Sequence, residues 1–430
     1  MAYTLISMLG TGSKTEKNKD GYQITDYSFP NGQHFITRLF MQAVFQSRKD
    51  INQIILLGTD TSSWDYLVDA VNDTRDETVL LWNDLFDQCE SLVKGKEPLG
   101  VTKENLDRLE KYLTERFGIE VIIEDHTHKV DDSTSEELFN CYTGITKRVK
   151  SNNNILFDIT HGFRSMPVLL YQSLQYSLSK ASNRDVEIIY GELDQSKNDK
   201  DKAIKYGYAR SLSSYWNYSE LSNALDVFES KLDGFRLADL IEKDWKLGSV
   251  AICRFSEIVL TNFALHIFEI ATQMKTAISS YPANAQKWHS RIRTMFEEVS
   301  SFIDANDKPR TLYKYSNFLY EKHLIVQAII TLQIAVEAAI AKYLKVEHKL
   351  GDYKWWNKEG SAVLYELKDE KNFKQDLDKL NDFRNQVAHG GGKDKNGGFK
   401  TDIKKISERY SEVYRHGKRG VENLFKELGL

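Results

Sequence analysis

The chain is poor in cysteine and proline, and each scarcity carries information. Its three cysteines, Cys89, Cys141 and Cys253, are too few and too scattered over 430 residues for a disulfide framework or a structural zinc site. Only five prolines interrupt the chain, so long stretches are free to form helices. The length favours two or three domains, and a hydrophobic content of 41% suffices to build their cores.

A secretory signal and a clear membrane span are also missing. The N-terminal stretch MAYTLISMLGTG has no basic start followed by a long apolar segment. One apolar run, Leu324 to Ala341, approaches the length of a span, but it contains Gln327, Gln333 and Glu337. We therefore expect this run to be a buried helix of a soluble, cytoplasmic protein.

Two nucleotide-binding motifs fail in detail. In GTGSKT a serine separates Gly12 from Lys14, whereas a P-loop needs adjacent glycine and lysine. Gly10 and Gly12 have no third glycine at the spacing of a dinucleotide-binding fingerprint. His126 and His128 could form part of a metal site, but no third ligand accompanies them. The sequence thus predicts neither a cofactor nor a metal ion.

Net charge excludes a uniformly basic nucleic-acid binder, because the formal charge is −4. The charge is unevenly distributed, however. The segment Ser301–Leu430 holds 24 Lys and Arg against 19 Asp and Glu, whereas the first 300 residues hold 34 against 43. The C-terminal part is therefore the better candidate to contact a polyanion, although ordinary variation in surface charge would also produce this difference.

Strands and helices alternate over the first 200 residues, as judged from apolar periods of two and of three to four. The alternation predicts an α/β fold, a mostly parallel sheet covered by helices on both faces. We expect strands at Tyr3–Leu9, Ile51–Gly58, Ile119–Glu124, Asn154–Thr160 and Val186–Leu193. We expect helices at His34–Phe45, Trp64–Val71, Thr78–Val93 and Lys103–Phe117, one beginning near Ser133–Glu136, and one stacking Leu170, Leu174 and Leu178.

The chain changes character after the charged stretch Asp194–Lys202, where the strands are expected to stop and helices to take over. The predicted domains are therefore residues 1–200, a helical connecting region 201–306, and an all-α domain 307–430 that begins near Pro309. GGGKDKNGG, residues 390–398, is expected to be a flexible basic loop.

Three predicted strands end in turns suited to a ligand. The turns are Gly10-Thr11-Gly12-Ser13, Gly58 to Trp64 with Asp60 and Ser62, and Thr160-His161-Gly162-Phe163-Arg164. Ligands of open α/β sheets bind beyond the carboxyl ends of the strands, and glycines, hydroxyls and an arginine suit phosphate. Phe163 or Trp64 could stack on a base. Each turn alone would also fit a capped strand-to-helix loop, and His161 alone would fit a structural histidine.

A second candidate site follows near the C-terminus, in RNQVAH. Phe373, Leu377, Leu380 and Val387 form a helical apolar stripe, and Arg384, Asn385 and His389 are polar. A histidine can move the proton of an RNA 2′-hydroxyl, and an arginine can stabilise the charge that grows on phosphorus. One pair supplies a sparse site, so a two-fold dimer that joins two pairs suits the chemistry better. An arginine and a histidine five apart also occur by chance.

Taken together, the two sites resemble those of the CRISPR-associated CARF–HEPN ribonucleases of type III systems. LGTG and FDITHGFRSMP are similar to the first turn and the THG-R signature of the Rossmann-like CARF domain, and RNQVAH is similar to the R-x4–6-H motif of HEPN domains. The helix with Glu337 resembles the HEPN core. The resemblance covers about the first 200 and the last 120 residues and leaves the middle region unmatched.

The resemblance implies a homodimer or higher even oligomer that binds a cyclic oligoadenylate and then cleaves single-stranded RNA without metal in antiviral defence. Arg384 and His389 become catalytic, and Asn385 supports them. The residues carried over to the ligand are Gly10, Thr11, Gly12, Ser13, Asp60, Ser62, Thr160, His161, Gly162, Phe163 and Arg164. A ring with an even number of units can share the two-fold axis of a dimer, and the resemblance favours cyclic tetra-adenylate over the six-membered ring.

Two other functions fit parts of the sequence. A CARF sensor with an inactive helical domain would be a ligand-regulated binding protein, and an intact Arg384 and His389 count against it. A nucleotide-dependent enzyme of another class could use the α/β end, and the missing P-loop and third glycine count against that. RNA preference, and whether the CARF domain degrades its activator, are left open by the sequence.

Overall fold

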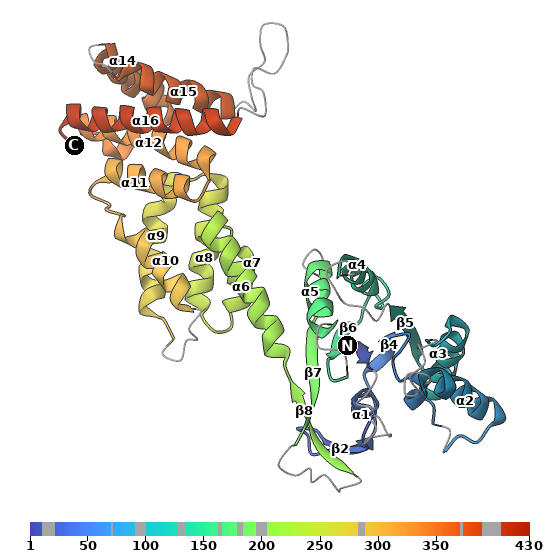
Figure 1. Ribbon diagram of the computed structural model, residues 1–430. Helices are drawn as coiled ribbons and strands as arrows, with labels where there is room; N and C mark the ends of the chain where they lie inside the picture. The colour runs from blue at the N-terminus through green and yellow to red at the C-terminus, as the bar shows by residue number, and fades with distance from the viewer. Residues whose placement is uncertain are drawn as a thin grey trace, which may run out of the picture. The chain divides into compact units, whose positions relative to one another are not determined.

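The computed structural model describes residues 1–10, 22–69, 72–90, 100–126, 135–161, 166–178, 184–194, 204–282, 289–369, 373–388 and 406–430. The chain folds as two compact units, Met1–Tyr218 and Ser219–Leu430. Figure 1 shows a sheet with helices in the first unit and helices throughout the second. A mixed, mostly parallel sheet followed by many helices confirms the predicted fold class.

The first unit is built on eight strands in the order β3-β2-β8-β7-β6-β1-β4-β5, counted over the described residues. Five of its pairings are parallel, and β2–β3 and β7–β8 are antiparallel. The strands are β1 Tyr3–Leu9, β2 Thr25–Ser28, β3 His34–Thr37, β4 Ile51–Thr59, β5 Glu120–His126, β6 Asn154–Asp158, β7 Val186–Leu193 and β8 Lys205–Ser211. The helices are α1 Phe40–Ser47, η1 Trp64–Leu67, α2 Asp76–Glu90, α3 Lys103–Phe117, α4 Ser135–Ile145 and α5 Met166–Leu178, with α6 Ser213–Lys231 at the boundary.

Both faces of this sheet are covered by helices, which explains the long apolar runs in its central strands. Leu5 and Leu56 join a core that includes residues of α1, α2 and α3. The neighbouring Ile6 and Leu57 point to the other face and join a core with residues of α4 and α5. Successive side chains along each strand therefore point alternately into two separate cores.

Three sequence predictions for this unit are wrong. Residues 34–45 were expected to form one helix, but β3 takes the first four residues and α1 begins only at Phe40. Strands were expected to stop after residue 194, yet β8 follows and pairs with both β7 and β2. The helix expected at Trp64–Val71 is a short 3-10 turn, Trp64–Leu67.

Glycines in β7 and β8 make room for aromatic side chains, and in β8 the glycine also weakens the sequence signal for a strand. A Cβ at Gly191 would lie 2.8 Å from the Phe40 ring, and one at Gly207 would lie 2.9 Å from the Tyr27 ring. The two strands therefore carry glycine where Tyr27 and Phe40 pack against them, and glycine interrupts the apolar pattern. Burial in this packing raises the pKa of the Tyr27 hydroxyl to about 12.

The second unit is helical throughout its described residues. Its helices are α7 Phe235–Ile241, α8 Lys246–Thr261, η2 Ala264–His266, α9 Ile267–Ser279, α10 His289–Ser301, α11 Lys308–Glu321, α12 Ile325–Tyr343, η3 Glu347–Lys349, α13 Tyr353–Trp355, η4 Trp356–Gly360, α14 Ser361–Asp369, α15 Lys374–Ala388 and α16 Ile406–Leu428. One continuous apolar core joins these helices, from Leu221 to Phe425. A boundary at residue 306 inside this unit stays a prediction.

Helix α12 is central to that core. It is the described helix that is long and apolar enough to cross a membrane, and it is the apolar run singled out in the sequence. It packs against α11, α15 and α16, and Ala328, Leu332, Ala335 and Ala339 are fully buried. Small alanines along its length allow the neighbouring helices to approach closely. This position agrees with the expected buried helix.

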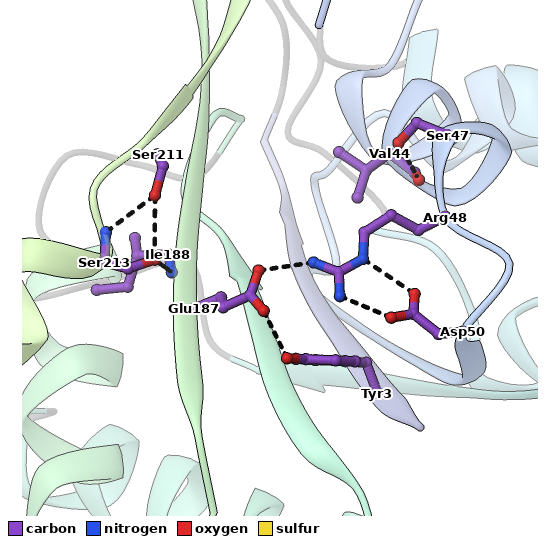
Figure 2. Close-up of polar contacts among 9 residues, drawn as sticks. All are labelled: Tyr3, Val44, Ser47, Arg48, Asp50, Glu187, Ile188, Ser211 and Ser213. Carbon is purple, nitrogen blue, oxygen red and sulfur yellow. Dashed lines mark hydrogen bonds and ion pairs between the residues drawn. The ribbon is translucent and has the colours of Figure 1, made fainter. Parts of the chain in front are cut away.

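At the starting end of the strands, an arginine joins three elements (Figure 2). Arg48 donates to Glu187 of β7 at 2.6 Å and, through two nitrogens, to Asp50 at 3.0 and 2.8 Å. Its guanidinium lies 4.2 Å from the centre of the Tyr3 ring, and the Tyr3 hydroxyl donates to Glu187 at 2.5 Å. The guanidinium holds the pKa of Asp50 below its ordinary value. This end of the sheet is thus closed by internal polar contacts.

We expect Arg48→Ala to lower the free energy of unfolding by about 1–2 kcal/mol, because a forked, partly buried ion pair and a cation–π contact are lost together. Urea denaturation measures the change. Arg75→Ala is the matched control, since Arg75 also binds one aspartate, Asp73, through two nitrogens, but at the exposed surface. Equal effects of the two substitutions would contradict the structural role of Arg48.

Candidate functional site

The described residues of the three turns predicted to hold a ligand lie close together at the carboxyl end of the sheet. β1 lies between β4 and β6, so the residues that follow these strands are neighbours. The Gly10 carbonyl accepts a hydrogen bond from the Ser63 backbone N–H at 3.0 Å. A Cβ on Gly10 would lie 2.5 Å from the His161 carbonyl oxygen, closer than any side chain can approach. Gly10 is therefore the point at which all three turns come into contact.

A tyrosine that sequence reasoning missed completes this junction. The Tyr22 hydroxyl accepts from the Gly10 N–H at 3.0 Å and donates to the Gly10 carbonyl at 2.9 Å. Its ring packs edge-on against Tyr66 and His161, with centroids 5.4 and 4.8 Å apart. No motif in the sequence marks Tyr22, because it lies beyond the glycine-rich turn that drew attention.

The turn after β4 is held together by its own side chains. Ser62 is fully buried, donates to the Leu9 carbonyl at 2.7 Å and accepts from the Thr59 N–H at 2.8 Å. The Asp60 carbonyl accepts from the Val101 N–H at 2.9 Å. Ser62 therefore fixes the turn against β1, and ligand contacts by Ser62 and Asp60 stay predictions.

Trp64 cannot stack on a base in this structure, which corrects one sequence prediction. Its side chain is fully buried, and its indole N–H donates to the Thr59 carbonyl at 2.8 Å. A Cβ on Gly58 would lie 2.4 Å from the indole, so the glycine of this turn serves to seat the tryptophan. The aromatic residue belongs to the core because the turn folds back over β4.

The turn after β6 begins with a buried carboxyl group. Asp158 is fully buried and accepts from the Ser7 hydroxyl at 2.7 Å, the Thr160 hydroxyl at 2.6 Å and the Thr160 N–H at 2.9 Å. Burial raises the pKa of Asp158. The Thr160 hydroxyl also accepts from the Gly191 N–H at 2.9 Å. Asp158 and Thr160 thus fix the direction in which the chain leaves the sheet.

His161 continues this arrangement as a structural acceptor. Its Nε2 atom accepts from the Phe40 N–H at 3.0 Å, which is one of the unpaired donors at the start of α1. Burial lowers the pKa of His161 to about 4, so the imidazole is neutral near pH 7. A contact between His161 and a ligand stays a prediction, and without a ligand the ring carries no positive charge at neutral pH.

Several predicted site residues lie outside the described residues. They are Thr11, Gly12, Ser13, Gly162, Phe163, Arg164, His389 and the loop 390–398, and the side chain of Asn385 belongs with them. His128 of the proposed histidine pair is also outside. Within the described ranges, no group of three His, Cys, Asp or Glu side chains is placed to hold a metal ion.

The second site lies on α15, which carries Arg384 and extends to Ala388. Arg384 lines a pocket of about 250 Å³ between α12, α14 and α15. Glu337 of α12 is near enough for the charge of Arg384 to act on it. Burial raises the pKa of Glu337 to about 7, and Arg384 opposes this rise. The structure therefore brings together Arg384 and Glu337, which the sequence placed on separate helices.

A polar cluster that sequence reasoning missed fixes α15 against α16. Asp376 of α15 is 6% exposed and accepts from Arg419 through both carboxylate oxygens at 2.6 Å. His416 Nδ1 lies 2.7 Å from Asp376, and His416 Nε2 lies 3.2 Å from Lys379 Nζ. Arg419 holds the pKa of Asp376 below its ordinary value. The pairing could not be read from sequence because forty residues separate its partners.

We expect Gly10→Ala to lower the free energy of unfolding by about 1–3 kcal/mol, because the new methyl group forces the turn after β6 away from β1. Denaturant titration measures this change. Gly144→Ala is the control, since a Cβ at this position in α4 meets nothing within 4 Å and alanine favours a helix. A Gly10→Ala variant as stable as Gly144→Ala would contradict the close contact.

Glu337 should make stability depend on pH. Its pKa is raised in the folded state, so its stabilising contribution is complete below about pH 4.3 and is lost as pH rises through about 7. Glu337→Gln should remove this loss, which amounts to at most about 3 kcal/mol. Urea denaturation of both proteins between pH 4.5 and 8 measures the difference, and a difference independent of pH would contradict the assignment.

Comparison with known proteins agrees with this geometry. Residues 4–194 match the family model described as the CARF domain of the CRISPR system endoribonuclease Csx1. The CRISPR-associated protein MJ1674 of Methanocaldococcus jannaschii is 23% identical over 340 residues, which are 75% of this chain and 50% of that protein. The chain thus spans about half the length of this curated relative.

Among solved structures, Enterococcus italicus Csm6 bound to cyclic hexa-2′-fluoro-hexa-dAMP aligns with a TM-score of 0.40 and 13% identity, covering 99% of this chain and 95% of that one. The family match covers the strands from β1 to β7 and the sequence of the three turns, and β8 lies beyond it. Residues 4–194 therefore resemble a CARF domain, and the chain resembles proteins of CRISPR systems.

Proposed function

We propose that this protein is an endoribonuclease of type III CRISPR defence, activated by a cyclic oligoadenylate and cleaving single-stranded RNA without a metal ion. The observation that carries the proposal is the pairing of a CARF domain of the family named for the endoribonuclease Csx1 with a helix that presents Arg384 in a pocket. His389 follows five positions later in the sequence.

Each residue of the second site has a chemical part in this proposal. His389 exchanges a proton with the 2′-hydroxyl or with the departing 5′-oxygen, because an imidazole titrates near neutral pH. Arg384 stabilises the negative charge that grows on the phosphoryl oxygens. Asn385 supports the pair, and Glu337 keeps a partly protonated carboxyl beside Arg384 near pH 7. RNA supplies its own nucleophile, so DNA is not cleaved.

The activator binds at the carboxyl end of the CARF sheet in this proposal. A cyclic oligoadenylate carries one negatively charged phosphate per unit. Backbone N–H groups after Gly10 and Gly162 can donate hydrogen bonds to these phosphates. Arg164 supplies the positive charge that a neutral His161 cannot supply. A homodimer places two such surfaces about a two-fold axis, so rings of four or six units fit and a ring of three does not.

A fluorescent RNA reporter tests the function directly. Wild type should cleave it when cyclic tetra-adenylate is present, in EDTA as well as in magnesium, and the products should carry 2′,3′-cyclic phosphate ends. His389→Ala should lower the rate at least about a hundredfold, within the ~10²–10⁴ range of general acid–base catalysis. The matched control is His348→Ala, which removes an exposed histidine of η3.

Three results would overturn parts of the proposal. Loss of cleavage in EDTA or a 3′-hydroxyl product would exclude this chemistry. Full activity of His389→Ala would exclude the site. Ring binding by calorimetry without any RNA cleavage would favour the alternative, a ligand-regulated binding protein with an inactive helical domain. Equal affinity for rings of three, four and six units would exclude the symmetric ligand site.

A further inference from the structure

The pocket that contains Arg384 has a lining unlike that of a simple phosphate site. Arg384 is the charged member among the described residues that line it. The pocket is also lined by carboxamides and aromatic rings, which belong to Gln333, Asn357, Asn381, Tyr353, Trp356 and Tyr365. At about 250 Å³ the pocket is somewhat smaller than the ~300–1,000 Å³ typical of drug-sized ligands. Such a lining suits one flat, uncharged, polar group.

Gln333 gives the clearest indication of a missing partner. It lies on α12, is 5% exposed, and its side chain lines the pocket. No residue that the structure describes forms a hydrogen bond with its carboxamide. Its carboxamide atoms are not among the sealed, unpaired side-chain atoms of the described residues, so they open into the pocket. A ligand in the pocket could therefore accept from and donate to this group.

A second carboxamide extends this polar edge. Asn381 lies on α15 one turn before Arg384 and is partly buried, and its carboxamide also forms no hydrogen bond with a described residue. Gln333 and Asn381 therefore offer acceptors and donors from two helices that pack against each other. Paired donors and acceptors of this kind read the edge of a nucleobase.

The aromatic side of the pocket is shaped by an unusual helical turn. Trp356–Gly360 forms a π-helical turn, a geometry common at functional sites. A Cβ on Gly360 would lie 2.6 Å from the Trp356 ring, so the glycine allows the indole to lie close to the helix. Tyr353 is 71% exposed and Tyr365 is 55% exposed beside it. Exposed rings around a polar pocket provide surfaces on which a base can stack.

We propose that this pocket is a nucleobase subsite, which holds one unpaired base of the RNA beside the phosphate that Arg384 contacts. Gln333 and Asn381 bind the edge of the base, and Trp356 stacks on its face. The inference rests on the proposed ribonuclease function and adds to it a source of base preference. It also explains why aromatic rings and carboxamides line the pocket that contains Arg384.

Chimeric oligonucleotides with one ribonucleotide in a DNA strand give the sharpest test, because cleavage is confined to one position. The four bases and an abasic ribose are placed at that ribonucleotide and, in a second series, at its 3′ neighbour. Wild type should prefer one base over the least favoured by at least about fivefold in kcat/KM in one series. The abasic substrate should be cleaved more slowly than the preferred base.

Gln333→Ala and Asn381→Ala should reduce the preference to less than about twofold, mainly by slowing the preferred substrate, and should leave the abasic substrate unchanged. Trp356→Ala should raise KM for all four bases and not for the abasic one. Tyr353→Ala, at an exposed position, repeats the stacking test without disturbing the core. The controls are Gln327→Ala and Tyr343→Ala, which lie outside the pocket on α12, the helix of Gln333. Both variants should behave as wild type.

The inference would be overturned if wild type cleaved all bases equally, or if Gln333→Ala and Asn381→Ala kept the base preference. In either case, cleavage itself would still support the proposed function. Binding of a 2′-fluoro trinucleotide, which cannot be cleaved, separates the two ideas further. If it binds wild type and loses affinity in Gln333→Ala while no RNA is cleaved, the subsite stands and the ribonuclease proposal fails. No binding and no base preference would exclude the subsite.

Discussion

The candidate ligand site depends on a close contact in the first unit, between Gly10 and the His161 carbonyl. The two residues follow adjacent parallel strands, and the space between their backbones is too small for a methyl group. The same glycine accepts from Ser63 and exchanges two hydrogen bonds with Tyr22. One backbone position thus fixes the relative heights of three turns, and a ligand at this edge would meet a surface whose shape is set before it arrives.

The two ends of the sheet use polar groups differently. At the starting end, Arg48, Asp50, Glu187 and Tyr3 satisfy one another and leave a closed surface. At the carboxyl end, Asp158 and His161 also form hydrogen bonds within the protein. Burial raises the pKa of Asp158 and lowers the pKa of His161, which favours the neutral form of each side chain. The His161 ring is therefore neutral near pH 7 and adds no positive charge to this edge. Any attraction for an anionic ligand has to come from backbone N–H groups and from the arginine that follows His161 in the sequence.

Much of the α/β fold could be predicted because its central strands are buried on both faces. Such strands appear in the sequence as long apolar runs. α3 and β7 were predicted residue for residue, and the meeting of three strand ends followed from parallel topology. β2 and β3 could not be predicted because each has only four residues, and β8 was missed because Gly207, which makes room for Tyr27, interrupts its pattern.

For the candidate sites, residue types indicated which side chains could take part in binding or catalysis. They did not indicate which of these side chains are buried or already hydrogen-bonded within the protein. Ser62 and Trp64 looked available to a ligand, yet both are fully buried and bonded within their own turn. Arg384 was predicted, whereas the partners that tie its helix to α16, Asp376 and Arg419, were not. Hydrogen bonds between residues distant in sequence are set by the tertiary fold, and a single sequence carries no direct record of them.

The position of α12 has a consequence for how relatives of this chain can vary in length. Gln333 and Glu337 are one turn apart on this helix, and the same helix fills the core against α11, α15 and α16. Inserting or deleting one residue would rotate everything beyond it by about 100°, turning the pocket residues and the core residues away together. Length changes in this half of the protein are therefore tolerable between helices, while residues 325–343 must keep their spacing.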